Sequence, residues 1–206
     1  MLNKFGWQNC GIRRFIEDEL PKLNKRRKCI VSVGTTTDIY DLIWIIDMLG
    51  YCYCDIAGIE INLSCHNVDL SFLQDRKTLE ELLATIKVIS PYPLIIKLAW
   101  ESDYLTIAKI AQDQGINLLH AINTIKAYHP KLGQCAQSSY KNKPIALKVI
   151  EDLRNNGITI PIIGGSGIWT KQDIKDYENA GANLFSMSHQ FFYAPFWPAI
   201  LAGKIN

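Results

Sequence analysis

Ile59-Glu-Ile-Asn-Leu-Ser-Cys-His-Asn-Val68 reads as an apolar strand that runs directly into a loop of thiol and carboxamide groups. In this loop Ser64 and Cys65 stand between Asn62 and Asn67. A thiolate can accept a proton, and a carboxamide can both donate and accept hydrogen bonds. The stretch therefore indicates a strand end suited to proton abstraction from a small polar ring. Taken alone, Cys65 also fits the alternative of a packed, inert thiol.

The composition is that of one globular domain. The 206 residues are 48% hydrophobic, and 22 basic against 20 acidic residues give a net charge of +2, too balanced for an electrostatic nucleic-acid binder. No apolar run is long enough to cross a membrane, and the first residues contain no apolar signal core. The six cysteines lack metal-site spacing. We therefore expect a single cytoplasmic domain over residues 1–206, without a metal and without a nucleic-acid or membrane partner.

Short apolar runs alternate with helical patterns along the chain. Near-continuous hydrophobicity is typical of parallel strands covered on both faces. The predicted strands are Cys29–Gly34, Gly58–Ser64, Leu94–Ala99, Leu118–Thr124, Ile160–Gly165 and Leu184–Ser188. The predicted helices are Asp38–Leu49, Thr78–Ile89, Asp103–Gln114, Pro144–Asn156 and Thr170–Ala180. This α/β order fits an open doubly wound sheet or a (β/α)8 TIM-type barrel, and both gather functional residues at the carboxyl ends of the strands.

Two features near the predicted strand ends, Lys97 and a glycine-rich turn, indicate what the site binds, whereas a third, His120, fits the core. Lys97 lies among aliphatic residues, so it either reaches solvent at the strand end or meets an anionic ligand or an electron-rich ring. Gly164–Gly167 joins a strand to a helix, as do turns that bind phosphate through backbone N–H groups, although tight packing also requires such turns. His120, inside an apolar strand, is expected to be a hydrogen-bonded core residue.

In their order along the chain these residues resemble class 1 dihydroorotate dehydrogenases. Asn62-Leu-Ser-Cys-His-Asn67 is similar to the family motif Asn-Leu-Ser-Cys-Pro-Asn, and cysteine in place of serine is typical of class 1. Asn3-x-x-Gly6-x-x-Asn9 resembles the segment that contacts orotate, and Ile122-Asn-Thr124 resembles the pair that holds orotate. The resemblance implies that the substrate contacts are Asn3, Gly6, Asn62, Asn67, Asn123 and Thr124.

Other stretches resemble the parts of this family that bind FMN. Ile96-Lys-Leu98 is similar to the strand whose lysine touches the flavin, and Ile162–Ile168 and Ala180–Ser188 are similar to the paired phosphate turns. The resemblance therefore implies FMN as cofactor. Its implied contacts are Asn62, Lys97, Ile122, Gly164, Gly165, Ser166, Gly167, Ser188 and His189.

The resemblance also implies a reaction, the oxidation of dihydroorotate to orotate in pyrimidine (UMP) biosynthesis. Cys65, beside Ser64, would remove the C5 proton of the substrate, and hydride would pass to N5 of FMN. Lys97 would stabilise the reduced flavin. These three residues form the implied catalytic set.

The chain departs from the family pattern in the catalytic loop and in the phosphate turns. His66 stands where the family has proline, Ser166 replaces a glycine, and Ser188-His189 replaces Gly-Thr. The alternative to an active enzyme is therefore a degenerate barrel fragment that has little or no activity and acts by binding or through a partner.

A further departure concerns the number of units. The segment at Asn3 follows two additional βα units in the family, so we expect a TIM-type barrel shortened at its N-terminal side to about six βα units. Six strands cannot close an eight-stranded barrel. The runs that begin at Cys29 and Leu184 would then be open edges, which a homodimer or a partner could cover.

Overall fold

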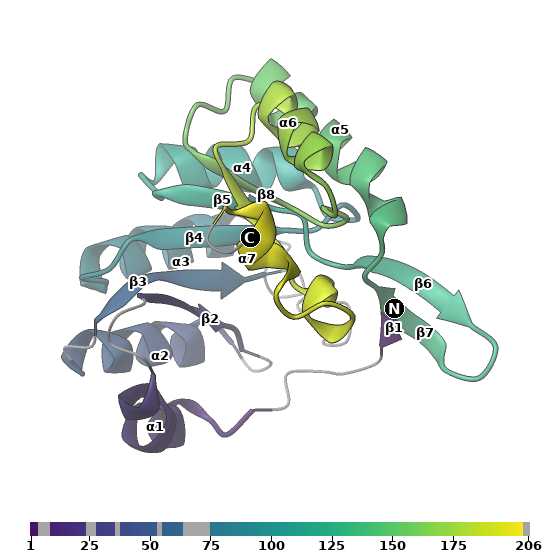
Figure 1. Ribbon diagram of the computed structural model, residues 1–206. Coiled ribbons are helices and arrows are strands. Elements are labelled where there is room, and N and C mark those ends of the chain that lie inside the picture. Colours follow the sequence, from purple (N-terminus) through teal and green to yellow (C-terminus); the bar gives the residue numbers. More distant parts are fainter. Residues whose placement is uncertain (4–8, 24–27, 36–37, 53–54, 64–74, 204–206) are drawn as a thin grey trace.

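The fold is a curled half-barrel sheet of six parallel strands flanked by helices (Figure 1). We describe it from a computed structural model, for residues 1–3, 9–23, 28–35, 38–52, 55–63 and 75–203. The strand order is β2-β3-β4-β5-β8-β9. The strands are β2 (Cys29–Val33), β3 (Ile56–Asn62), β4 (Leu94–Leu98), β5 (Leu118–Ala121), β8 (Ile162–Gly165) and β9 (Leu184–Ser186). All six predicted strands are confirmed, as is the TIM-type α/β class.

The five predicted helices are also present, with ends close to the predicted ones. They are α2 (Ile39–Tyr51), α3 (Arg76–Ile89), α4 (Tyr104–Asp113), α5 (Lys143–Asn155) and α6 (Lys171–Ala180). Aspartate side chains cap the first turns of two of these helices. Asp38 accepts a hydrogen bond from the backbone N–H of Asp41 at the start of α2, and Asp75 accepts one from that of Thr78 at the start of α3. Helix α3 therefore begins before the predicted Thr78, because Asp75 and not the threonine is its cap.

The core lies between the sheet and these helices. Ile59 and Ile61 of β3 pack in one cluster with Ile96 and Leu98 of β4, and with helix residues such as Leu82. Because side chains alternate along a strand, the residues between them point to the opposite, inner face of the curled sheet. That inner face carries polar and charged side chains in the middle strands.

An antiparallel hairpin follows β5 and was not predicted. Its strands are β6 (Ile125–His129) and β7 (Gly133–Gln137), and β1 (Leu2–Asn3) pairs with β7 at its outer side. Figure 1 shows this small sheet projecting beside the main one. Short helical turns complete the described part: α1 (Ile12–Arg14), η1 (Phe15–Glu19), η2 (Leu20–Lys22), η4 (Tyr140–Asn142), η5 (His189–Phe192) and α7 (Trp197–Leu201).

The outermost strands of the main sheet are β2 and β9, as the sequence predicted. Within the part of the chain that the structure describes, each pairs with a neighbour on one side only. Ile30 on β2 and Leu184 on β9 are both exposed. Among the described helices, none combines the length and the apolar character that crossing a membrane requires.

The packing of α3 gives a direct test of this core. Leu82 is fully buried, whereas Val88 on the same helix is 85% exposed. Leu82→Ala is expected to lower the free energy of unfolding by about 2–5 kcal/mol, since it leaves a cavity. Val88→Ala, the matched control, is expected to stay within about 0.5 kcal/mol of the wild type. Chemical denaturation measures both, and similar losses for the two variants would contradict this placement of α3.

Candidate active site

A cavity of about 200 Å³ lies at the carboxyl ends of the strands from β4 to β9. Its wall includes residues of the strands β4, β5 and β9 and of the segments that follow β5, β8 and β9. The sequence-predicted site residues that line it are Lys97, Ile122, Asn123, Thr124, Ser166, Gly167 and Ser188. The fold therefore brings together residues that are far apart in the chain, as expected for a site at the carboxyl ends of parallel strands.

Lys97 is held at this cavity by a buried carboxylate. Its ammonium group lies 3.2 Å from Oε1 of Glu60 on the neighbouring strand β3, and its side chain is 20% exposed. Lys97 is therefore largely buried and has Glu60 as its counter-charge. The pairing explains how a cation is tolerated among the aliphatic residues of β4.

Glu60 is the centre of a wider polar network. Ser32 donates its hydroxyl to Oε1 of Glu60 at 2.8 Å, and Nδ1 of His120 lies 2.5 Å from Oε2. Burial alone would raise the pKa of Glu60, but the hydrogen bond with His120 and the charge of Lys97 lower it to about 2. The carboxylate is therefore ionised at neutral pH.

His120 links this carboxylate to the far side of the cavity. Its Nε2 lies 2.7 Å from Oγ of Ser186 on β9, and its side chain is 10% exposed. The prediction of a hydrogen-bonded core histidine is confirmed. The ring also lines the cavity, which the sequence did not indicate.

Two of the predicted carboxamides meet at the strand ends. Nδ2 of Asn123 donates to Oδ1 of Asn62 at 3.2 Å. The backbone of Asn123 donates to the carbonyl of Leu98, and its own Oδ1 accepts from the backbone N–H of Thr124. Asn62 also borders a wider, mostly apolar hollow of about 610 Å³ along the open edge strand β2. The pair thus stands between the two cavities.

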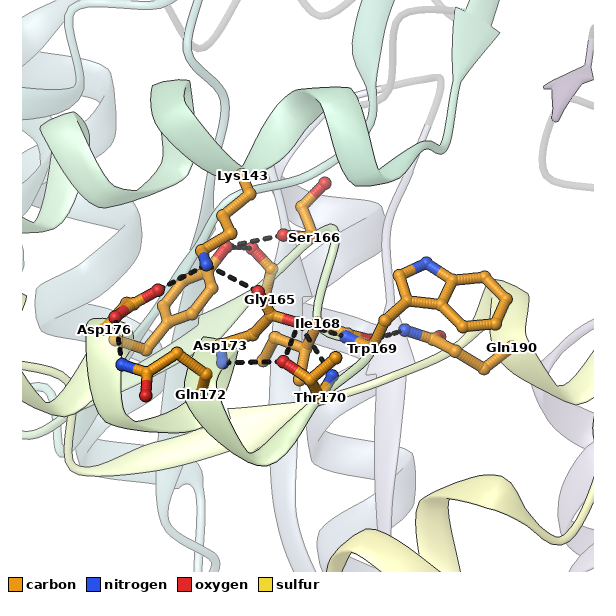
Figure 2. A network of polar contacts seen from close by, with 11 residues as sticks. Lys143, Gly165, Ser166, Ile168, Trp169, Thr170, Gln172, Asp173, Asp176 and Gln190 are labelled. Atoms are coloured by element: carbon orange, nitrogen blue, oxygen red, sulfur yellow. Dashed lines mark hydrogen bonds and ion pairs between the residues drawn. The ribbon is translucent and has the colours of Figure 1, made fainter.

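Close packing shapes the glycine-rich turn after β8, of which Figure 2 shows Gly165 and Ser166. A Cβ on Gly164 would come within 2.5 Å of the Tyr177 ring, and one on Gly165 within 2.4 Å of Oγ of Ser186. The hydroxyl of Tyr177 donates to the carbonyls of Gly165 and Ser166, at 2.8 and 2.5 Å. Gly164 and Gly165 therefore lie behind the turn, and its next two residues line the cavity.

The same turn is tied to the start of α6 by Asp173 (Figure 2). Asp173 accepts hydrogen bonds from the backbone N–H groups of Trp169 and Thr170, and Lys143 lies 2.5 Å from it. Burial would raise the pKa of Asp173, but the hydrogen bonds from Lys143, Trp169 and Thr170 lower it to about 2. An ionised carboxylate thus anchors the end of the turn.

Several predicted residues are not placed at the cavity. Asn3 lies in β1 of the small antiparallel sheet and is not among the described residues that line it. The turn after β9 continues into η5 at His189, whose side chain is not described. The predicted residues Gly6, Ser64, Cys65 and Asn67 lie outside the described residues.

Besides His120, Ser138 and Met187, which line the cavity without having been predicted there, Glu60, Ser186 and Gln190 were missed. Glu60 carried a signal, because a lone carboxylate in an apolar strand calls for a partner as Lys97 does. Ser186 and Gln190 carried none, since a serine and a glutamine near a strand end are common at surfaces. Gln190 lines the cavity and is 1% exposed. Its Oε1 has no hydrogen-bond partner among the described residues.

The fold and the site define an α/β protein of the TIM-barrel type whose polar cavity opens at the carboxyl ends of its strands. The family model for dihydroorotate dehydrogenase matches residues 1–205. The chain belongs to the dihydroorotate dehydrogenase family, a family of oxidoreductases.

Individual relatives agree with this assignment. The chain is 28% identical over 221 residues to a putative dihydroorotate dehydrogenase A (fumarate) of Solibacter usitatus, covering 100% of the chain and 71% of the relative. It is 32% identical over 209 residues to a dihydroorotate dehydrogenase B (NAD(+)), catalytic subunit, of Alkaliphilus metalliredigens, covering 95% and 68%. A relative with the same name from Shouchella clausii is 31% identical over 211 residues, with 95% and 68% covered. The chain is thus shorter than these relatives.

Because Asp173 anchors the turn as an ionised carboxylate, we expect its contribution to the free energy of unfolding to depend on pH. A carboxyl whose pKa drops from 3.8 to about 2 on folding stabilises the fold above about pH 4, and this contribution is lost as the pH falls through about 2. Asp173→Asn is therefore expected to lower the free energy of unfolding by about 1 kcal/mol at neutral pH. The difference from the wild type should shrink between about pH 4 and pH 2.

Denaturation at a series of pH values measures this difference. Asp113→Asn is the control, because Asp113 forms an exposed pair with Lys109 on α4. A constant difference between wild type and Asp173→Asn down to about pH 2 would contradict the assignment.

Proposed function

We propose that this chain oxidises dihydroorotate to orotate with FMN as the hydride acceptor. The observation that carries the proposal is the cavity in which Lys97, Asn123 and the turn at Ser166 and Gly167 converge, with Asn62 bonded to Asn123 at its border. Membership of the dihydroorotate dehydrogenase family supports the same substrate, since the curated relatives carry that name.

The residues at the cavity fit FMN chemically. Lys97 offers a cation beside the position of an electron-rich ring, and the backbone of Ser166, Gly167 and Ser188 suits a phosphate. Gln190 adds a buried acceptor that has no partner among the described side chains and backbone groups. An orphaned buried acceptor is costly, so a hydroxyl from a bound ligand would stabilise it.

Dihydroorotate loses a proton from C5 and a hydride from C6 when its ring becomes unsaturated. Bound FMN supplies the acceptor for the hydride. In this proposal Cys65 takes the proton, with Ser64 beside it, since a thiolate can serve as the base. Asn62, Asn67 and Asn123 orient the pyrimidine, because each carboxamide both donates and accepts hydrogen bonds.

A second candidate function is a binding protein that has lost catalysis. It is favoured by Ser166, whose side chain stands in the turn at φ 85°, and by the two open sheet edges at β2 and β9. Relatives named as catalytic subunits suggest that a partner subunit could cover such an edge. A homodimer is the other arrangement that would cover it.

Cofactor binding is the first test. The purified chain, reconstituted with FMN, is expected to retain flavin absorbance after gel filtration. Lys97→Met should weaken FMN binding by about tenfold, because it removes the cation beside the ring. Lys109→Met on the outer helix α4 is the control, and fluorescence titration measures both. No retained flavin in the wild type would overturn the proposal.

The base is tested separately. Cys65→Ala is expected to lower kcat for dihydroorotate oxidation by about 10²- to 10⁴-fold, the usual contribution of a general base, while FMN binding persists. Cys52→Ser, at the end of α2, is the matched control. Activity in the wild type that does not depend on Cys65 would refute the assignment, and flavin binding without any activity would favour the second candidate.

A further inference from the structure

Glu60 has no part in the substrate and cofactor contacts above, yet it contacts three side chains across the inner face of the sheet. It lies in the middle of β3 and is 6% exposed. Its two oxygens contact Ser32 of β2, Lys97 of β4 and His120 of β5. One carboxylate therefore joins four consecutive strands.

The strand register explains why Glu60 can reach Lys97. Ser32 is level with Glu60, whereas Asn62, Lys97 and His120 form the next inward-facing row towards the cavity. The carboxylate thus reaches from the row beneath the cavity up to two residues that line it. Both of these partners also line the cavity wall.

The two oxygens of the Glu60 carboxylate have different partners. Oε1 receives the ammonium of Lys97 and the hydroxyl of Ser32, and Oε2 receives the ring of His120. His120 is held on its other side by Ser186 of β9. With both oxygens engaged, Glu60 holds the ammonium in one place and gives it a counter-charge.

We propose that Glu60 is a positioning residue that holds Lys97 at the cavity and moderates its charge towards a bound electron-rich ring. Removal of the carboxylate leaves the lysine charge uncompensated, which favours the reduced, more electron-rich form of the cofactor. This inference rests on the proposed function, since it takes FMN as the group beside Lys97.

A double-mutant cycle with Glu60→Gln and Lys97→Met tests it on the FMN-loaded chain. Glu60→Gln keeps the shape and an acceptor oxygen but removes the charge. It is expected to favour the reduced cofactor by about tenfold, a rise of about 30 mV in the two-electron midpoint potential. Lys97→Met is expected to lower the potential. In the Lys97→Met background Glu60→Gln should have little effect, because Glu60 acts through the lysine.

Glu81→Gln is the matched control, because Glu81 forms an exposed pair with Lys77 on the outer helix α3. It should leave the potential unchanged. A shift by Glu60→Gln that is equally large with and without Lys97 would overturn the inference, as would no shift with FMN still bound. A purely structural role for Glu60 would lower stability without moving the potential.

A second measurement needs no cofactor and separates this inference from the proposed function. In the chain without FMN, Lys97→Met leaves a buried carboxylate with fewer partners and should lower the denaturation midpoint. Adding Glu60→Gln should restore part of the loss. Additive losses would refute the pairing. A wild type that cannot bind FMN would defeat the proposed function, whereas this cycle would still decide whether Glu60 holds Lys97.

Discussion

A buried carboxylate inside a sheet is stable only if its neighbours supply charge and hydrogen bonds, and this constraint organises the inner face of the protein. Glu60 meets it with Ser32, Lys97 and His120, which come from the strands on both sides. Each partner must therefore point inward at the correct level. The register of the four parallel strands brings these partners within reach of Glu60. Lys97, the only lysine within these four strands, can therefore lie on the inner face with a counter-charge beside it.

The outer face of the same sheet follows a simpler rule, and the sequence predicted it well. Apolar runs flanked by capped helices gave all six strands and five helices, because local hydrophobic patterns and caps decide these elements. The hairpin β6–β7 was missed, since Ile125–His129 is only partly buried and follows β5 after a few residues. Strand β6 pairs with β7, and β7 pairs in turn with β1, so the hairpin depends on these pairings and not on a local pattern.

The site was predictable where a residue type was out of place in its segment. Lys97 stood out among aliphatic residues, and Asn62 and Asn123 stood out at strand ends. The partners of these residues were harder to predict, because a hydrogen bond such as that between His120 and Ser186 joins residues 66 positions apart. Such pairs are set by strand order, which a single sequence does not specify.

The turn after β8 shows how packing and binding can require the same residues. Ser166 adopts φ 85°, a conformation that favours glycine and costs a serine about 1 kcal/mol. The hydroxyl of Tyr177 stabilises this conformation by donating to two consecutive carbonyls, and Gly164 leaves the space that the tyrosine ring needs. These contacts hold the turn in this conformation with a serine at position 166. Because the strained Ser166 also borders the cavity, its conformation motivates the hypothesis that the turn binds a ligand.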